Sequence, residues 1–358
     1  MQTVEGVVTT CHGRFRIERG YDPSVRVPDF TLKCVGFVGE VTHRDATGVS
    51  GDLNATGFFV SIPCAAPELV KTLTSTVYFV TAKHVADDLK GKEFYFLVNK
   101  VGGGTLAIES IVGNKWWLHP TDKTADVAVA HVSGRAAAGA DVISVLISQL
   151  ATPERLLIAD IGIGDEVFVT GLFTPAPGIA QNVPIVRHGN IAMMPSEQIQ
   201  TELGYADVYL IEARSIGGLS GSPVFARPTI RLKLPQKGSK GAAFLGTGDG
   251  ATLLGLMHGH WDIREDQKNK AFYDQDRKHG VNMGIGIVVP ASKILETINQ
   301  DELVRSRQEA EGRVSRRMVP GTDSATPDNG ATFTQRDFEN ALKKASRKIE
   351  PAGKQEKR

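Results

Sequence analysis

A serine enclosed by small residues is the first candidate for a catalytic group in this chain. Ser220 lies in the stretch GGLSGSP, residues 217–223. A serine hydroxyl is a weak nucleophile until a neighbouring base removes its proton, and that base must itself be oriented, most often by a carboxylate. Because a flexible surface loop is also rich in Gly and Ser, the stretch predicts a nucleophile only if a histidine and an aspartate accompany it.

A histidine and an aspartate in suitable surroundings are present upstream. His84 follows a strongly β-type run and opens a polar turn. Asp126 begins an alternating apolar strand, where an acid that faces the core needs a hydrogen-bonding partner. Asp122, Asp87 and Asp88 are the alternatives to Asp126. Only Asp126 begins a periodic strand, which favours it as the partner of the histidine.

Together these residues resemble the motifs of the chymotrypsin-fold (trypsin-like) serine peptidases. TAKHVA, ADVAVA and GGLSGSP are similar to the histidine, aspartate and serine motifs of that family and occur in the same order. The spacing also matches, with 42 residues from His84 to Asp126 and 94 from Asp126 to Ser220. Three motifs in order are a strong signal, whereas each alone is weak. The resemblance covers about residues 30–300.

The resemblance implies a serine endopeptidase with a role for each motif residue. His84 is expected to act as general base and then general acid, Asp126 to hold the ring tautomer, and Ser220 to form an acyl-enzyme. The amides of Gly218 and Ser220 would form the oxyanion hole. Neither a metal nor an organic cofactor is required by this chemistry.

A substrate pocket beside the serine is also implied. Arg214, six residues before the serine, falls where the pocket floor often lies in that family, with Ser215 next to it, and a basic floor favours an acidic substrate side chain. One inserted residue would instead leave Arg214 in solvent, the commoner state of an arginine. The strand of His258, Gly259 and His260 is expected to border the pocket.

The same histidines permit a second interpretation, as ligands of a metal ion. The alternation of a strand places His258 and His260 on one face, and Asp262 and His279 offer further donor atoms. Because the choice of a fourth ligand is arbitrary, the sequence favours a site without a metal.

Short β-type runs separated by turn residues follow one another from about Thr31 onward. Their spacing predicts an all-β protein rather than alternating βα units. The resemblance implies two antiparallel six-stranded β-barrels, over about residues 30–150 and 151–300, with a closing C-terminal helix near residues 290–298. Residues 1–29 are an N-terminal extension outside it. Two polar insertions, 227–250 and 262–282, are open to interpretation, the first as a hairpin or a flap.

The last part of the chain changes in composition. Residues 301–333 are polar and charged, lack the apolar residues that offset the entropy of ordering, and predict a linker. Residues 334–358 begin with a capping-box-like stretch and predict a short basic amphipathic helix and tail. This helix could dock on a partner or on its own domain, and a frayed helix that packs nowhere is the alternative.

Composition limits the classes of partner and the compartment. The 358 residues include 41 basic and 40 acidic ones, so charge does not point to nucleic acid or to a membrane surface. Three cysteines without CxxC spacing favour a reducing compartment. The N-terminus does not resemble a secretory signal, and no apolar run approaches ~20 residues. We therefore expect a soluble, cytoplasmic protein.

Activation and activity leave further alternatives. No Ile-Val-Gly-Gly-type amino terminus is visible and Leu219 replaces the polar residue that often precedes the serine, so the chain looks more like intracellular bacterial or organellar members of the family. The substrate would be a protein or peptide. The leading rival is a non-catalytic chymotrypsin-fold binding protein, which the intact triad disfavours. A peptidase that is silent until a partner rearranges its oxyanion loop is a third possibility.

Overall fold

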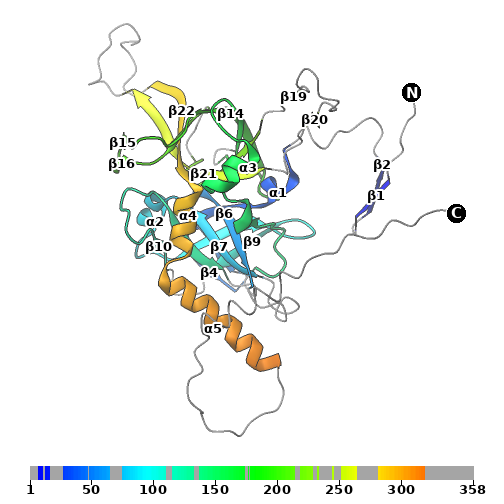
Figure 1. The fold of residues 1–358 in the computed structure, drawn as a ribbon. Helices are drawn as coiled ribbons and strands as arrows, with labels where there is room; N and C mark the ends of the chain where they lie inside the picture. The colour runs from blue at the N-terminus through cyan, green and yellow to red at the C-terminus, as the bar shows by residue number, and fades with distance from the viewer. Residues whose placement is uncertain are drawn as a thin grey trace, which may run out of the picture. The chain divides into compact units, whose positions relative to one another are not determined.

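The computed structural model describes most of the chain in fourteen stretches. They are residues 7–10, 13–16, 27–46, 48–64, 75–109, 115–132, 137–173, 176, 178–213, 218–228, 232–233, 244–245, 251–263 and 281–318. Contacts divide the chain into Met1–Val314 and Ser315–Arg358. The two β units that form the body of the protein both belong to the first part (Figure 1).

The first β unit is an eight-stranded sheet. Its strands are β3 (Val35–Glu40), β6 (Leu53–Pro63), β7 (Ser75–Thr81), β8 (Phe94–Asn99), β9 (Thr105–Glu109), β10 (Trp117–Leu118), β11 (Ala128–Val132) and β12 (Val145–Leu146). They pair in the order β10-β11-β7-β6-β3-β8-β9, and β12 pairs with β6. Phe79 packs between Phe59 and Phe96, with ring centroids 5.0 and 4.0 Å away. These buried rings explain why the aromatic-rich runs form strands.

The second β unit is a closed, antiparallel six-stranded barrel. Its strands are β13 (Glu166–Leu172), β14 (Pro184–Met193), β17 (Tyr209–Glu212), β18 (Pro223–Arg227), β21 (Thr252–Ile263) and β22 (Val281–Pro290). They pair around the circle in the order β13-β14-β17-β22-β21-β18. Closure removes unpaired edges, which is how an all-β chain satisfies its backbone hydrogen bonds.

The small strands form hairpins outside these two units. They are β1 (Val7–Thr10) with β2 (Gly13–Arg16), β4 (His43–Asp45) with β5 (Gly48–Ser50), β15 (Ile199–Thr201) with β16 (Gly204–Ala206), and β19 (Leu232–Lys233) with β20 (Phe244–Leu245). The last pair lies within the 227–250 insertion, where its two antiparallel partners fit the hairpin interpretation.

The all-β prediction is confirmed, and so is a six-stranded barrel in the second half of the chain. The first unit differs from the prediction in strand number, with eight strands instead of six. Within the described residues no pairing joins its end strands, β9 and β10, so a closed first barrel stays a prediction.

Among the described residues the helices are few and, apart from the last, short. They are α1 (Asp29–Lys33), α2 (Lys83–Asp88), the 3-10 turn η2 (Ile147–Gln149), α3 (Pro153–Ala159), α4 (Ala291–Ile298) and α5 (Asp301–Met318). The predicted closing helix is α4, which lies against β21 of the barrel and β11 of the first sheet (Figure 1). Among the helices of the described stretches, none has both the length and the apolar character needed to cross a bilayer.

The stretch predicted as a linker begins with a helix instead. Residues 301–318 form α5, which has Asp301 and Glu302 in its first turn, where acidic side chains interact favourably with the helix dipole. Leu303 is buried, and Arg307 donates hydrogen bonds to the hydroxyl of Tyr78 at 2.9 Å and to a backbone carbonyl of α4 at 2.8 Å. The start of α5 is thus held by one buried apolar side chain and by the hydrogen bonds of one arginine. The average polarity of the stretch 301–333 does not indicate these two contacts. The helix predicted over 334–358 lies outside the described residues.

Candidate active site

His84 and Asp126 are brought together by the pairing of β7 with β11. His84 is the second residue of α2, which starts directly after β7, and Asp126 precedes β11 by two residues. Thr81 and Ala128 are partners in the register of the two strands. His84 and Asp126, which are 42 residues apart in the sequence, are therefore in direct contact at one end of the sheet.

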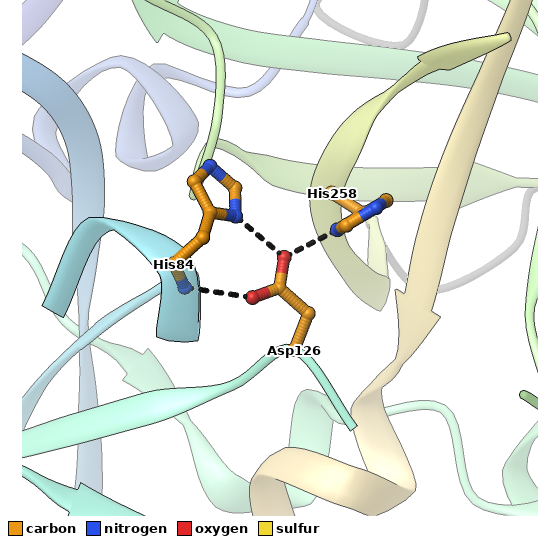
Figure 2. A group of neighbouring side chains, drawn as sticks. All are labelled: His84, Asp126 and His258. Atoms are coloured by element: carbon orange, nitrogen blue, oxygen red, sulfur yellow. Dashed lines mark hydrogen bonds and ion pairs between the residues drawn. The ribbon is translucent and has the colours of Figure 1, made fainter. Parts of the chain in front are cut away.

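Two hydrogen bonds join His84 to Asp126 (Figure 2). The ring Nδ1 lies 2.8 Å from Oδ2. The backbone N–H donates to Oδ1 at 2.9 Å, so the carboxylate also satisfies a donor in the first turn of α2. The Asp126 side chain is only 2% exposed, whereas that of His84 is 39% exposed. A buried, oriented carboxylate thus holds an accessible imidazole.

The two groups shift each other's pKa in opposite directions. Burial raises the pKa of Asp126, but hydrogen bonds from His258 and His84 outweigh it and hold that pKa well below its usual range. Burial lowers the pKa of His84, but the hydrogen bond and charge of Asp126 outweigh it, so the pKa is raised. Asp88 and Glu202 raise it further by their charge. The carboxylate therefore stays ionised and strengthens the histidine as a base.

The alternative acids have other roles. Asp122 Oδ1 accepts hydrogen bonds from the backbone N–H of Thr124 at 2.9 Å and from its hydroxyl at 2.6 Å, which fixes the turn leading to Asp126. Burial raises the pKa of Asp122, but the bonds from Thr124 and from Lys293 outweigh it and lower the pKa to about 2. Asp87 and Asp88 lie exposed at the end of α2.

The loop that carries Ser220 is fixed by the first sheet. Thr56 of β6 donates its hydroxyl to the carbonyl of Gly218 at 2.8 Å and its backbone N–H to the carbonyl of Ser220 at 3.2 Å. Gly221 has φ +80°, and a Cβ there would lie 2.3 Å from Thr56 O and from Thr81 Oγ1. Only glycine fits this close approach in this backbone conformation. The backbone conformation and the close packing of the loop therefore require small residues around the serine.

Two backbone N–H groups beside the serine are available to a ligand. Within the described part of the chain, the N–H groups of Gly218 and Ser220 donate no hydrogen bond. The next two along the chain do, from Gly221 to Met257 O at 2.8 Å and from Ser222 to Leu219 O at 2.9 Å. The two amides that the family resemblance implies for an oxyanion hole therefore have no acceptor among the described residues.

The hydroxyl of Ser220 points to a third residue. Its Oγ lies 3.4 Å from the backbone carbonyl oxygen of His258, a long contact for an O–H donor. Among the described residues, neither Ser220 nor any other side chain hydrogen-bonds His84 Nε2. His84 and Asp126 are therefore in contact, and the Ser220 hydroxyl contacts the backbone of His258, whose ring bonds Asp126. The link from the hydroxyl to the imidazole is unmade in this state, so the triad stays a prediction.

His258 contacts the carboxylate of Asp126, a contact that the sequence did not indicate. Its Nδ1 is hydrogen-bonded to Asp126 Oδ2, the same oxygen that accepts from His84 (Figure 2). Gly259 and His260 follow on β21. Arg214 and Ser215 lie outside the described residues, so the predicted pocket floor stays a prediction. The contact of His258 depends on a β-bulge, described below, for which the sequence carries no signal.

Two imidazoles and a carboxylate are donor types that zinc favours, and their ligand atoms all lie within 4.8 Å of one another. The cluster differs from the metal interpretation of the sequence, because only His258 is common to the two sets. Neighbouring ligands of a tetrahedral zinc ion are about 3.3 Å apart, given Zn–N distances of 2.0–2.1 Å. The 2.8 Å between His84 Nδ1 and Asp126 Oδ2 is instead a hydrogen-bond distance. We therefore interpret the cluster as hydrogen-bonded.

Comparisons with known proteins place these observations beside solved structures. No protein-family model and no curated protein matches the chain. The MamO protease domain from Magnetospirillum magneticum, in its apo form, is 15% identical, with a TM-score of 0.43 over 76% of this chain and 98% of that one. Deg5 is 14% identical, with a TM-score of 0.35 over 57% of this chain and 81% of that one.

A third solved structure is the HtrA-type protease AlgW with a decapeptide. It is 12% identical, with a TM-score of 0.38 over 80% of this chain and 66% of that one. At these levels of similarity no residue role is transferred, so the function proposed next rests on the side chains of this chain.

Proposed function

We propose that the chain is a serine endopeptidase in which Ser220, His84 and Asp126 form the catalytic triad. The observation that carries the proposal is the pair of hydrogen bonds from His84 to Asp126, at 2.8 and 2.9 Å, beside a serine on a tightly fixed glycine-rich loop. A carboxylate that accepts the Nδ1 proton selects the tautomer in which Nε2 can accept another. That is the base a serine nucleophile requires.

Catalysis begins with rotation of the Ser220 hydroxyl from the His258 carbonyl toward His84 Nε2. His84 takes the hydroxyl proton as Oγ bonds to the scissile carbonyl carbon, whose oxygen becomes an oxyanion. The N–H groups of Gly218 and Ser220 are the proposed donors to that oxygen, and each donor of this kind contributes about 2.7–4 kcal/mol.

Acyl transfer is completed by the same ring. The imidazolium of His84 donates its proton to the leaving amine as the carbon–nitrogen bond breaks, which leaves an ester on Ser220. A water molecule, deprotonated by His84, then attacks the ester and restores the hydroxyl. The negative charge of Asp126 stabilises the imidazolium throughout.

Peptides or proteins are the proposed substrates. Arg214 and Ser215 remain proposed as the pocket floor, which would favour an acidic side chain before the scissile bond. A panel of fluorogenic peptides tests this preference, and equal cleavage after acidic and neutral residues would contradict it.

Labelling with a fluorophosphonate probe tests the proposed nucleophile. The parent protein should form a covalent adduct, and Ser220→Ala should not, because the probe reacts only with an activated hydroxyl. Ser222→Ala is the matched control, since Ser222 is buried two residues further on and its hydroxyl has no partner among the described residues. Labelling that persists in Ser220→Ala would show that another residue is the nucleophile.

A second candidate function is a chymotrypsin-fold protein that binds peptides or partners without catalysis, or only after a partner activates it. The observation that favours it is the Ser220 hydroxyl, which contacts His258 O rather than His84. A folded parent that never reacts with the probe would support this candidate. The predicted helix at 334–358 is the proposed docking segment for such a partner.

A further inference from the structure

We propose that His258 is a positioning residue that anchors the triad at two points: its ring fixes the Asp126 carboxylate, and its backbone carbonyl holds the Ser220 hydroxyl in the resting state. This inference rests on the proposed function, because it assigns a role within the same site. It is carried by three hydrogen bonds and by the backbone of β21.

The first step is the β-bulge that contains His258. In the register of β21 with β22, Met257 is the partner of Val288 and Gly259 is the partner of Ile287. Val288 and Ile287 are adjacent in β22, whereas their partners in β21 are separated by one residue. That extra residue is His258. A bulge interrupts the alternation of a strand and re-aims a side chain, and bulges are over-represented next to active sites.

The second step concerns the hydrogen bonds that the buried carboxylate of Asp126 accepts. Asp126 Oδ1 accepts the backbone N–H of His84, and Oδ2 accepts the Nδ1 protons of both His84 and His258. Donors on both oxygens leave the carboxylate little freedom to rotate. Both rings must carry a proton on Nδ1 for these bonds to form, so the neutral form of His84 presents an unprotonated Nε2. The His258 side chain is only 13% exposed, which keeps water from replacing its donor.

The third step is the resting place of the nucleophile. The carbonyl of His258 is 3.4 Å from Ser220 Oγ. The carbonyl comes from the same bulged residue whose ring anchors Asp126, so one residue sets the distance between the nucleophile and the triad acid. The neighbouring bond from Met257 N–H to Ser222 O, at 2.8 Å, ties the bulge to the serine loop.

The test compares His258→Ala with His258→Asn in the full chain. An asparagine amide nitrogen lies close to the place of Nδ1 and keeps a donor that does not titrate, whereas alanine removes the donor. His258→Ala should lower kcat about 10- to 100-fold, the effect of losing one hydrogen bond to a charged group, and His258→Asn should restore most of it. KM should change by less than about threefold, because the ring acts through Asp126 rather than on the substrate.

The split between kcat and KM, together with rescue by His258→Asn, separates positioning from a structural effect. Full kcat in His258→Ala, in a parent that reacts with the fluorophosphonate probe, would overturn the inference and leave the proposed function standing.

A measurement that needs no activity distinguishes the two failures. Proton NMR of the Ser220→Ala protein should show two low-field Nδ1–H signals, one lost in His84→Ala and the other in His258→Ala. A parent that does not react with the probe while both signals are present would contradict the proposed function and keep the anchoring role of His258. Loss of no signal in His258→Ala would overturn the inference in either case.

Discussion

Competition between burial and a charged partner decides the chemistry of His84. Burial alone would lower the pKa of the ring and weaken it as a base, but Asp126 contributes a hydrogen bond and a charge that together raise the pKa. Burial of Asp126 would be costly if its carboxylate oxygens accepted no hydrogen bonds, because a buried carboxylate without donors takes up a proton instead. The ionised state of Asp126 and the raised pKa of His84 thus depend on the contact between them.

The raised pKa of His84 predicts the acid limb of activity. The usual pKa of a histidine is 6.5, so kcat/KM should fall as pH decreases through a midpoint above that value, because the protonated ring cannot accept the serine proton. Asp126→Asn should lower the midpoint and reduce kcat about 10⁴-fold, the effect known for the equivalent change in established Ser-His-Asp enzymes. The measurement is the rate of peptide cleavage between pH 4 and 9.

Asp88→Asn is the graded control for this prediction. Asp88 is exposed and acts on His84 only through its charge, so its removal should lower the midpoint slightly and leave kcat within about twofold. A midpoint in Asp126→Asn that equals that of the parent would contradict the role of Asp126.

At the scale of elements, the site depends on bonds between strands rather than on any one loop. Thr56, buried in β6, contacts both sides of the serine loop and also accepts the N–H of Leu172 in β13 at 3.1 Å. One hydroxyl therefore links a strand of the first sheet, a strand of the barrel and the proposed oxyanion loop. The order of the loop is a property of these three elements together.

Thr56→Val tests this link with little change in shape. The substitution leaves Gly218 O and Leu172 N without the Thr56 hydroxyl, at a cost of about 1–3 kcal/mol for the buried N–H of Leu172 and less for the half-buried carbonyl of Gly218. Because Gly218 belongs to the proposed oxyanion hole, kcat should fall about tenfold in molecules that remain folded. The free energy of unfolding in urea and the rate of peptide cleavage measure the two effects.

Thr31→Val is the matched control for the element-scale prediction. Thr31 is equally buried, and its hydroxyl donates to Pro28 O at 2.7 Å at the start of α1. Its loss should lower stability without lowering kcat. Equal losses of kcat in the two variants would show that Thr56 acts on stability alone.

Elements with a strong local pattern could be predicted from the sequence, and elements defined by partners could not. The runs around Phe59, Phe79 and Phe225 are β-branched and aromatic, and they form the expected strands. The motifs of His84, Asp126 and Ser220 predict a meeting of three side chains. The pairing of β7 with β11 brings His84 and Asp126 into contact, and the bonds of Thr56 fix the loop of Ser220.

The bulge at His258 shows why the remainder could not be predicted. It depends on how two strands of a closed barrel fit their registers, and an alternating sequence predicts only an unbroken strand, with His258 and His260 on one face. The start of α5 was missed for a related reason. Its anchors, Leu303 and Arg307, are two residues in a polar stretch, and their partners lie far away in the sequence.

At the scale of the whole molecule, the helix after the barrel returns to the first sheet. Lys293 of α4 forms an ion pair with Asp122 at 3.0 Å, and Glu296, one turn further on, hydrogen-bonds His119 Nε2 at 2.8 Å. Asp122 in turn fixes the turn that leads to Asp126. The second β unit and its helix therefore supply both the serine and a support for the acid, so the site is complete only when the two units pack correctly.

Lys293→Met tests this coupling between the units. The Lys293 and Asp122 side chains are only 16% and 25% exposed, so the substitution leaves a partly buried carboxylate without its cation and should cost about 1–2 kcal/mol. Because the turn before Asp126 loosens, kcat should also fall several-fold. Lys92→Met, which removes a more exposed ion pair to Glu40 within the first unit, should cost less than about 1 kcal/mol and leave kcat unchanged. If both variants kept the kcat of the parent in cleavage assays, the packing of α4 would stabilise the fold without positioning Asp126. A carboxylate that depends on the turn of Asp122 would lose its position when that turn is displaced, and kcat would fall.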